Sequence, residues 1–149
     1  MTRFAIRQVA HQSPDYIATV QLRQDILRTP LGLVFGEDDL AREADQWHYG
    51  LWKDDQLLAC LVIVPLPERT WKMRQVAVQS RWQGKGIGQQ LVRHIEALAL
   101  TQGVARIALH ARANVVPFYE KLGYALVGEP FTEVGIPHRK MEKHLPLAF

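Results

Sequence analysis

The sequence predicts an α/β or α+β fold, with one mixed sheet of about six or seven strands and about four helices. Short apolar runs such as Gln56–Val64 and Trp71–Val78 are typical of strands. The stretch Gly84–Gln102 carries apolar residues at spacings of three and four, as an amphipathic helix does. We find no repeat, linker or low-complexity segment, so we expect one domain over residues 1–149.

The first half of the chain is expected to hold three strands and two helices. These are, in order, a strand over Arg3–Val9, a helix from Pro14 to about Arg28, a short helix over Asp38–Asp45, and a hairpin of Trp47–Trp52 and Gln56–Val64. Ser13 is a suitable N-cap for the first helix, and Pro14 fits its first position because that residue needs no N–H donor. Thr29 and Pro30 should end this helix.

The second half should alternate strands with helices. Its expected elements are a strand over Trp71–Val78, a helix over Gly84–Gln102, a strand over Ala105–His110, a helix over Asn114–Leu122, and two closing strands, about Tyr124–Val127 and Arg139–Leu145, that flank a loop. Asn114 is the expected N-cap of the shorter helix, Pro117 lies in its first turn and Gly123 suits its C′ position.

The segment Gln83–Gly88 is the most informative part of the sequence. It reads Gln-Gly-Lys-Gly-Ile-Gly, and it lies between a predicted strand and a predicted helix. The first N–H groups of a helix have no intrahelical acceptor and lie at the positive end of the helix dipole. Glycines allow a ligand to approach such groups closely. The segment therefore predicts a site for phosphate or pyrophosphate.

The glycine spacing excludes two familiar phosphate sites. A P-loop needs Gly-x4-Gly-Lys-Ser/Thr, which is absent, and the dinucleotide fingerprint lacks its third glycine, because the required position falls on Ile87 or Gln89. A nucleotide-binding domain is therefore disfavoured. The spacing that fits is Gln/Arg-x-x-Gly-x-Gly, formed by Gln83, Gly86 and Gly88. This pattern resembles the acyl-CoA signature of the GNAT N-acetyltransferase superfamily.

A second stretch carries the same resemblance. The run from Asn114 through Phe118 and Tyr119 to Tyr124 is similar to the second GNAT signature, in which the tyrosine of the Phe-Tyr pair faces the CoA sulfur. The segment Phe131–Met141 resembles the C-terminal part of the bacterial ElaA/YjcF-like branch. Strong resemblance covers about Arg74–Met141 and implies the GNAT fold.

The resemblance implies an N-acetyltransferase that moves an acetyl group from acetyl-CoA directly to an amine. The residues it assigns to CoA are Val76, Ala77, Val78, Gln83, Gly84, Lys85, Gly86, Ile87, Gly88, Asn114, Phe118 and Tyr119. Backbone groups of Val76 and Val78 would pair with the pantetheine arm, and an N–H near Val78 would stabilise the oxyanion. Tyr119 would be the general acid that protonates the leaving thiolate.

The general base is left open by the sequence. Many superfamily members carry a glutamate on the strand before the glycine loop, whereas this strand has Lys72, Arg74 and Gln75. The candidates are His110, at the end of its predicted strand, and Glu133 and His138 in the closing segment. We favour the closing segment, because a turn over Gly135-Ile136-Pro137 could aim both side chains at the amine.

The acceptor amine is not identified by the sequence. Arg23, Glu133 and His138 are candidate substrate contacts. Further polar groups that could line the substrate pocket are Arg28, Glu37, Asp38 and Asp39. Their mixed charges do not distinguish a small-molecule amine from a peptide amine. A module that binds acyl-CoA without turnover is the alternative function, and the missing carboxylate is its best support.

Composition argues against several classes of partner and site. The net charge is +3 and the pI is about 9.2, but the basic residues are scattered, so we expect no nucleic-acid partner. The longest apolar run, Leu57–Leu66, is too short to span a membrane, and no signal-peptide core precedes it. No Cys/His cluster has metal-ligand spacing. The single cysteine, Cys60, suits a reducing cytoplasm, and its apolar strand disfavours a nucleophilic thiolate. The resemblance implies a bacterial protein, and we expect a monomer or homodimer.

Overall fold

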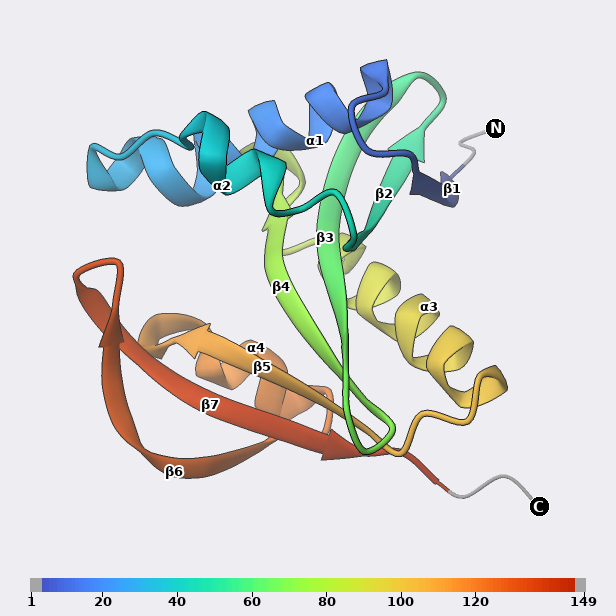
Figure 1. Cartoon of the computed structure of the whole chain (residues 1–149), viewed down its shortest axis with the longest axis vertical. Coiled ribbons are helices and arrows are strands. Elements are labelled where there is room, and N and C mark those ends of the chain that lie inside the picture. The colour runs from blue at the N-terminus through green and yellow to red at the C-terminus, as the bar shows by residue number, and fades with distance from the viewer. Residues whose placement is uncertain (1–3, 147–149) are drawn as a thin grey trace. The chain divides into compact units, whose positions relative to one another are not determined.

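The structure, a computed structural model, describes residues 4–146 (Figure 1). Seven strands form one mixed sheet in the order β1-β2-β3-β4-β5-β7-β6, which confirms the predicted sheet and its strand number. The chain divides into two compact units, Met1–Val64 with Gln75–Ile95, and Pro65–Arg74 with Glu96–Phe149. Among the described residues no helix is long and apolar enough to cross a membrane.

The first unit contains the N-terminal strands and helices. Its elements are β1 (Phe4–Val9), α1 (Pro14–Arg23), α2 (Glu37–Ala41), β2 (Trp47–Lys53), most of β3 (Gln56–Leu66), the end of β4 (Thr70–Val78) and the first turns of α3 (Ile87–Thr101). Ser13 caps α1 as predicted, since its hydroxyl accepts from the Tyr16 N–H at 3.2 Å. After α1 the chain makes a π-helical turn over Gln24–Arg28 and a 3₁₀ turn over Thr29–Leu31, and the left-handed Gly32 ends the helical stretch. The prediction that Thr29 and Pro30 end it is therefore wrong, because proline fits the start of a helical turn.

The β2–β3 hairpin forms the buried centre of the first unit. The strands pair antiparallel, and Asp54 adopts a left-handed φ of 53° in the two-residue turn. Residues Leu58–Ile63 of β3 are at most 1% exposed, so both faces of this strand are covered. Gly50 has no room for a side chain, because a β-carbon there would lie 2.5 Å from the Trp52 ring. Core packing therefore sets the residue size at this position.

The second unit contains the remaining strands and α4. Its elements are the start of β4, the second half of α3, β5 (Arg106–Arg112), α4 (Val116–Lys121), β6 (Ala125–Glu133) and β7 (Ile136–His144). Strand β4 pairs parallel with β5, which pairs antiparallel with β7. One face of this sheet buries Ile107, Leu109 and Met141, each at most 2% exposed. Alternate residues of the same strands point to the other face.

The helix α4 ends as predicted but begins differently. Gly123 has a φ of 96° and donates to the Glu120 carbonyl, while the Tyr124 N–H bonds the Tyr119 carbonyl, which is the Schellman arrangement. The prediction that Asn114 is the N-cap is wrong. A 3₁₀ turn over Ala113–Val115 precedes α4, and Val115 is the N-cap without a side-chain hydrogen bond.

The segment predicted as a loop between the closing strands is itself mostly strand. β6 extends to Glu133, β7 starts at Ile136, and their register pairs Phe131 with His138. The predicted turn over Gly135-Ile136-Pro137 is also wrong, because the turn is Val134-Gly135, with φ values of 45° and 78°. Two consecutive left-handed residues match the twist of a tight hairpin. Strand β5 continues to Arg112, so His110 lies two residues before its end.

Candidate active site

The glycine loop presents open backbone before α3. Gly84 and Gly86 have φ values of 76° and 81°, and no atom lies within 4 Å of the place where either β-carbon would stand. Lys85 is exposed, whereas Ile87 and Gly88 are buried at the start of the helix. The Gln90 N–H donates to the Gly86 carbonyl at 3.0 Å. The N–H groups before Gln90 therefore precede the helical ladder and suit an anionic ligand.

The glycine loop is hydrogen-bonded to the end of β4. The Gln83 amide donates to the Val78 carbonyl at 3.0 Å, and the Gln79 N–H donates to the Leu58 carbonyl at 2.8 Å. The first of these bonds ties the first residue of the loop signature to the strand. Gln83 therefore has a structural role in the loop that the sequence did not predict.

A left-handed residue interrupts β4. Gln75 has a φ of 53°, an uncommon conformation for a residue with a side chain. Parallel pairing with β5 covers Thr70–Met73, and the stretch Gln75–Val78 lies beyond it. Within this stretch Val76 and Val78 are half-buried and Ala77 is 1% exposed. Its backbone thus has the extended form that an added ligand strand requires.

Tyr119 lies on α4 in the second unit and is 7% exposed. Its ring meets the rings of Phe118 and Tyr124 edge to face, with centroid distances of 5.0 and 5.7 Å. Burial raises the pKa of Tyr119, so the phenol keeps its proton at neutral pH. Among the described residues its hydroxyl has no hydrogen-bond partner, and Asn114 is exposed. A protonated phenol with no other acceptor can donate to a ligand.

The structure brings the three candidate bases together in the second unit. His110 Nδ1 lies 3.0 Å from Glu133 Oε1, and His138 Nε2 lies 3.6 Å from Glu133 Oε2. His138 is 4% exposed, and its Nδ1 lies 3.0 Å from the Ile136 carbonyl. Phe131 packs edge to face on His110 with a centroid distance of 4.9 Å. The extended β6–β7 hairpin creates this proximity.

The protonation of this cluster follows from its contacts. Burial raises the pKa of Glu133, but the hydrogen bond and charge of His110 outweigh it, and the net pKa lies below its usual range. An ionised Glu133 accepts the Nδ1–H of His110. When His110 is neutral, its Nε2 then carries the lone pair of a base.

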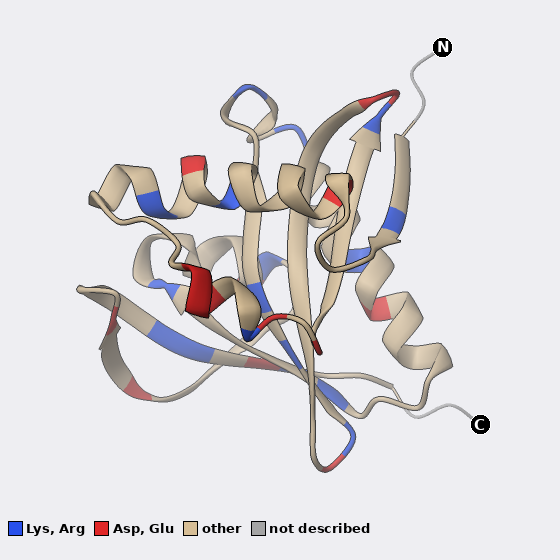
Figure 2. Ribbon diagram, turned by 45° about the horizontal axis from the view of Figure 1, so that its top comes forward, with Lys and Arg blue, Asp and Glu red and all other residues tan. Residues whose placement is uncertain are grey.

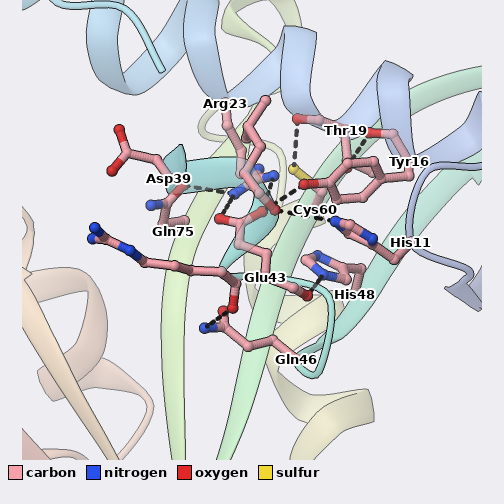
Figure 3. Close-up of polar contacts among 12 residues, drawn as sticks. His11, Tyr16, Thr19, Arg23, Asp39, Glu43, Gln46, His48, Cys60 and Gln75 are labelled. Atoms are coloured by element: carbon pink, nitrogen blue, oxygen red, sulfur yellow. Dashed lines mark hydrogen bonds and ion pairs between the residues drawn. The ribbon is translucent and has the colours of Figure 1, made fainter. Parts of the chain in front are cut away.

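Arg23, a predicted substrate contact, is in a different environment. Its side chain is 0% exposed and makes two hydrogen bonds to Glu43, Nη1 to Oε2 at 2.7 Å and Nη2 to Oε1 at 2.8 Å (Figure 3). Nη1 also donates to Gln75 Oε1 at 2.9 Å, and the Tyr16 hydroxyl donates to Glu43 Oε1 at 2.8 Å. These contacts favour a structural role for Arg23 over direct contact with a substrate.

Burial and pairing fix the charges of this ion-pair cluster. Burial raises the pKa of Glu43, but Arg23 outweighs that effect and the net pKa is below its usual range. Burial and the bond to Glu43 raise the pKa of Tyr16 to about 12. Burial lowers the pKa of His48, whose Nε2 lies 3.0 Å from the Glu43 carbonyl. The cluster is therefore one buried cation and one buried anion among neutral donors.

Cys60 lies beside this cluster and is 1% exposed. Its Sγ lies 3.8 Å from the Thr19 carbonyl, and burial raises its pKa to about 12. A thiol of this kind stays protonated at neutral pH and is a poor nucleophile. Among the described residues no group of three or more His, Cys, Asp or Glu side chains is placed to hold a metal ion.

The buried ion pair predicts a specific pattern of stability. Glu43→Gln should lower the free energy of unfolding by about 3–5 kcal/mol, because it leaves the Arg23 cation without its anion. Because the folded-state pKa of Glu43 is depressed, its contribution is present above about pH 4.3 and is lost as the pH falls through the folded value. Urea denaturation at a series of pH values from about 3 to about 8 measures the free energy of unfolding and its pH dependence.

A surface pair provides the matched control. Arg7 and Asp15 also form an ion pair, at 3.2 Å, but their side chains are 49% and 48% exposed. Asp15→Asn should cost less than about 1 kcal/mol. Equal losses for Glu43→Gln and Asp15→Asn would show that the buried pair contributes no more than a surface pair.

The comparisons with known proteins give the family. A model of the family described as acetyltransferase (GNAT) domain matches residues 35–145. The uncharacterized N-acetyltransferase YjcF of Bacillus subtilis is 33% identical over 73 residues, which are 48% of this chain and 52% of YjcF. The chain spans about half the length of the first curated relatives that it matches.

Solved structures agree on the fold. Escherichia coli ElaA is 25% identical with a TM-score of 0.77, over 93% of this chain and 99% of ElaA. An aminoglycoside 6′-N-acetyltransferase complexed with coenzyme A shares the fold at 18% identity and a TM-score of 0.76, over 97% of this chain and 98% of that protein. Because the family match covers most of its residues, the chain belongs to the GNAT family of acetyltransferases.

Proposed function

We propose that this protein transfers an acetyl group from acetyl-CoA directly to a primary amine of a small molecule or peptide, in the bacterial cytoplasm. The observation that carries the proposal is the backbone of the glycine loop. Gly84 and Gly86 are left-handed and open, and they precede a helix whose first N–H groups lack helical acceptors. Such a loop fits the pyrophosphate of CoA.

CoA recognition would involve the glycine loop, one stretch of β4 and two residues of the second signature. The Gln83–Gly88 loop holds the pyrophosphate, and the open stretch of β4 at Val76, Ala77 and Val78 pairs with the pantetheine arm. Asn114 and Phe118, from the second signature, complete the proposed cofactor contacts.

The chemistry begins with attack of the amine nitrogen on the thioester carbonyl. A C–N bond forms, and negative charge develops on the carbonyl oxygen, where an N–H near Val78 stabilises it. The C–S bond then breaks and CoA leaves as a thiolate. Tyr119 gives the thiolate its phenolic proton, and the amine proton goes to the base. Atoms and charges balance without a metal ion or an acetylated residue.

His110 is the proposed proton acceptor. Glu133 accepts its Nδ1–H, which leaves Nε2 available for the amine proton or for a bridging water. His138 is nearly buried and bonded to the Ile136 carbonyl, so it supports Glu133 in this scheme. This proposal moves the base from the closing segment, which we favoured from sequence, to the neighbouring strand β5. Binding of acyl-CoA without turnover is not favoured by the comparisons.

Gly86→Val should weaken acetyl-CoA binding by about tenfold or more, which corresponds to ~1.4 kcal/mol. A φ of 81° is strained for valine, and its side chain would occupy the open space over the loop. Isothermal titration with acetyl-CoA measures the change. Gly103→Val is the control, because Gly103 is also left-handed, at φ 74°, with open space around it. Unchanged affinity in folded Gly86→Val would remove the loop from the proposed site.

Tyr119→Phe should lower the turnover number by about 10²–10⁴-fold and leave acetyl-CoA affinity almost unchanged, since a general acid acts mainly in the transition state. Steady-state assays of CoA release measure both quantities. Tyr124→Phe is the control, because it also removes a buried hydroxyl, one that donates to Glu96 at 2.9 Å. If Tyr119→Phe keeps the parental turnover number, another group or water protonates the thiolate.

His110→Ala should remove the acidic limb of the pH–rate profile, because no imidazole is left to take the amine proton. Glu133→Gln should lower the turnover number but keep that limb, since the imidazole remains. His94→Ala, at an exposed histidine of α3, should change neither. An unaltered limb in His110→Ala would transfer the base role to His138, Glu133 or bulk water.

A further inference from the structure

A pocket of about 360 Å³ lies within the second unit. Side chains from β4, β5 and β7 line it, among them Lys72, Arg106, Ala108, His110 and Lys140. The strand register explains why they meet. Lys72 is opposite Ala108, and His110 is opposite Lys140, so these residues share the face opposite the one that carries Leu109 and Met141. Ala108 is small and leaves space beside Lys72.

The charged side chains of the pocket wall are three cations, Lys72, Arg106 and Lys140, and two carboxylates, Glu68 and Glu142. Lysine and arginine residues recur along the strands of the second unit (Figure 2). Arg106 is paired with Glu68 at 3.4 Å, and Lys140 with Glu142 at 3.5 Å. Lys72 differs, because among the described residues no carboxylate lies within ion-pair distance of its ammonium. Its half-buried ammonium therefore makes no direct ion pair, although the charge of Glu133 acts on it from a greater distance.

Without a ligand, the surroundings of Lys72 destabilise its charged form. Burial lowers the pKa of Lys72, and the charges of Arg74 and Lys140 lower it further, while the charge of Glu133 opposes them. A partly desolvated cation beside other cations is stabilised by an anion that hydrogen-bonds to it. Because Arg106 and Lys140 each pair with one of the two pocket carboxylates, Lys72 is the cation left to bind a negatively charged ligand group.

We propose that this pocket binds an anionic group of the acceptor, so that the acceptor is an amine carrying a carboxylate or a phosphate. This inference rests on the proposed acetyl transfer, because His110 lines the same pocket. His110 is two residues along β5 from Ala108, a rise of about 6.6 Å. An acceptor of a few carbons would then place its anion near Lys72 and its amine near His110.

Matched pairs of amines test the inference. The carboxylate pair is 4-aminobutyrate with propylamine, and the phosphate pair is 3-aminopropyl phosphate with 3-aminopropanol. The anionic member of at least one pair should have a kcat/KM about tenfold or more above that of its neutral partner. A charge-assisted hydrogen bond between the anion and Lys72 is strong enough to give such a difference. The pair that shows the preference identifies the type of anion.

Variants locate the effect in the pocket. Lys72→Met should abolish the preference by raising KM for the anionic amine, with little change for its neutral partner, and Lys140→Met should reduce it. Lys121→Met, at an exposed lysine of α4, is the control and should retain the preference. Equal kcat/KM values for charged and neutral amines, or a preference that survives in Lys72→Met, would overturn the inference while acetyl transfer stands.

Direct binding separates this inference from the proposed function. Isothermal titration of 4-aminobutyrate and 3-aminopropyl phosphate into parent and Lys72→Met protein, with CoA present, needs no turnover. If no amine is acetylated but one anionic compound binds the parent and is weakened by Lys72→Met, acetyl transfer fails and the anion site stands. If neither compound binds and no amine pair shows a preference, the anion site is rejected.

Discussion

The buried pair of Arg23 and Glu43 is the constraint on which the first unit depends. It joins the last residue of α1 to the chain after α2, and through Gln75 it reaches the left-handed residue of β4. Removing one partner would leave a charge in a dry environment, so each residue requires the other. The strand that carries Val76–Val78 toward the glycine loop is therefore held at the residue where its backbone departs from regular β geometry.

In the second unit, charged side chains line the proposed acceptor site. Glu133 lies between two imidazoles, and the same sheet presents Lys72 and Lys140 on the face that includes His110. A base and an anion site on neighbouring strands would hold the two ends of one acceptor, which favours reaction by proximity. Cys60, whose thiol is buried and protonated, does not offer a covalent route. These features together support direct transfer between acetyl-CoA and an amine.

Local features were predictable from sequence, and contacts between distant residues were not. The Ser13 cap, the left-handed Gly123 and the helix after the glycine loop follow from residues within one or two turns. The β6–β7 hairpin was missed because Gly128, Gly135 and Pro137 indicate a loop, although they occupy a bulge, a tight turn and the second residue of a strand. The partnership of Arg23 with Glu43 spans 20 positions and carries no local signal.

The proposed reaction is direct transfer without an acetylated enzyme. Initial rates measured while both acetyl-CoA and the acceptor are varied test it, together with intact mass spectrometry of protein mixed with acetyl-CoA alone. For direct transfer we expect intersecting double-reciprocal lines and no acetyl adduct on the protein, because both substrates must be bound before the C–N bond forms. Parallel lines with an acetyl group on Cys60 would contradict it, because that is the signature of a covalent intermediate.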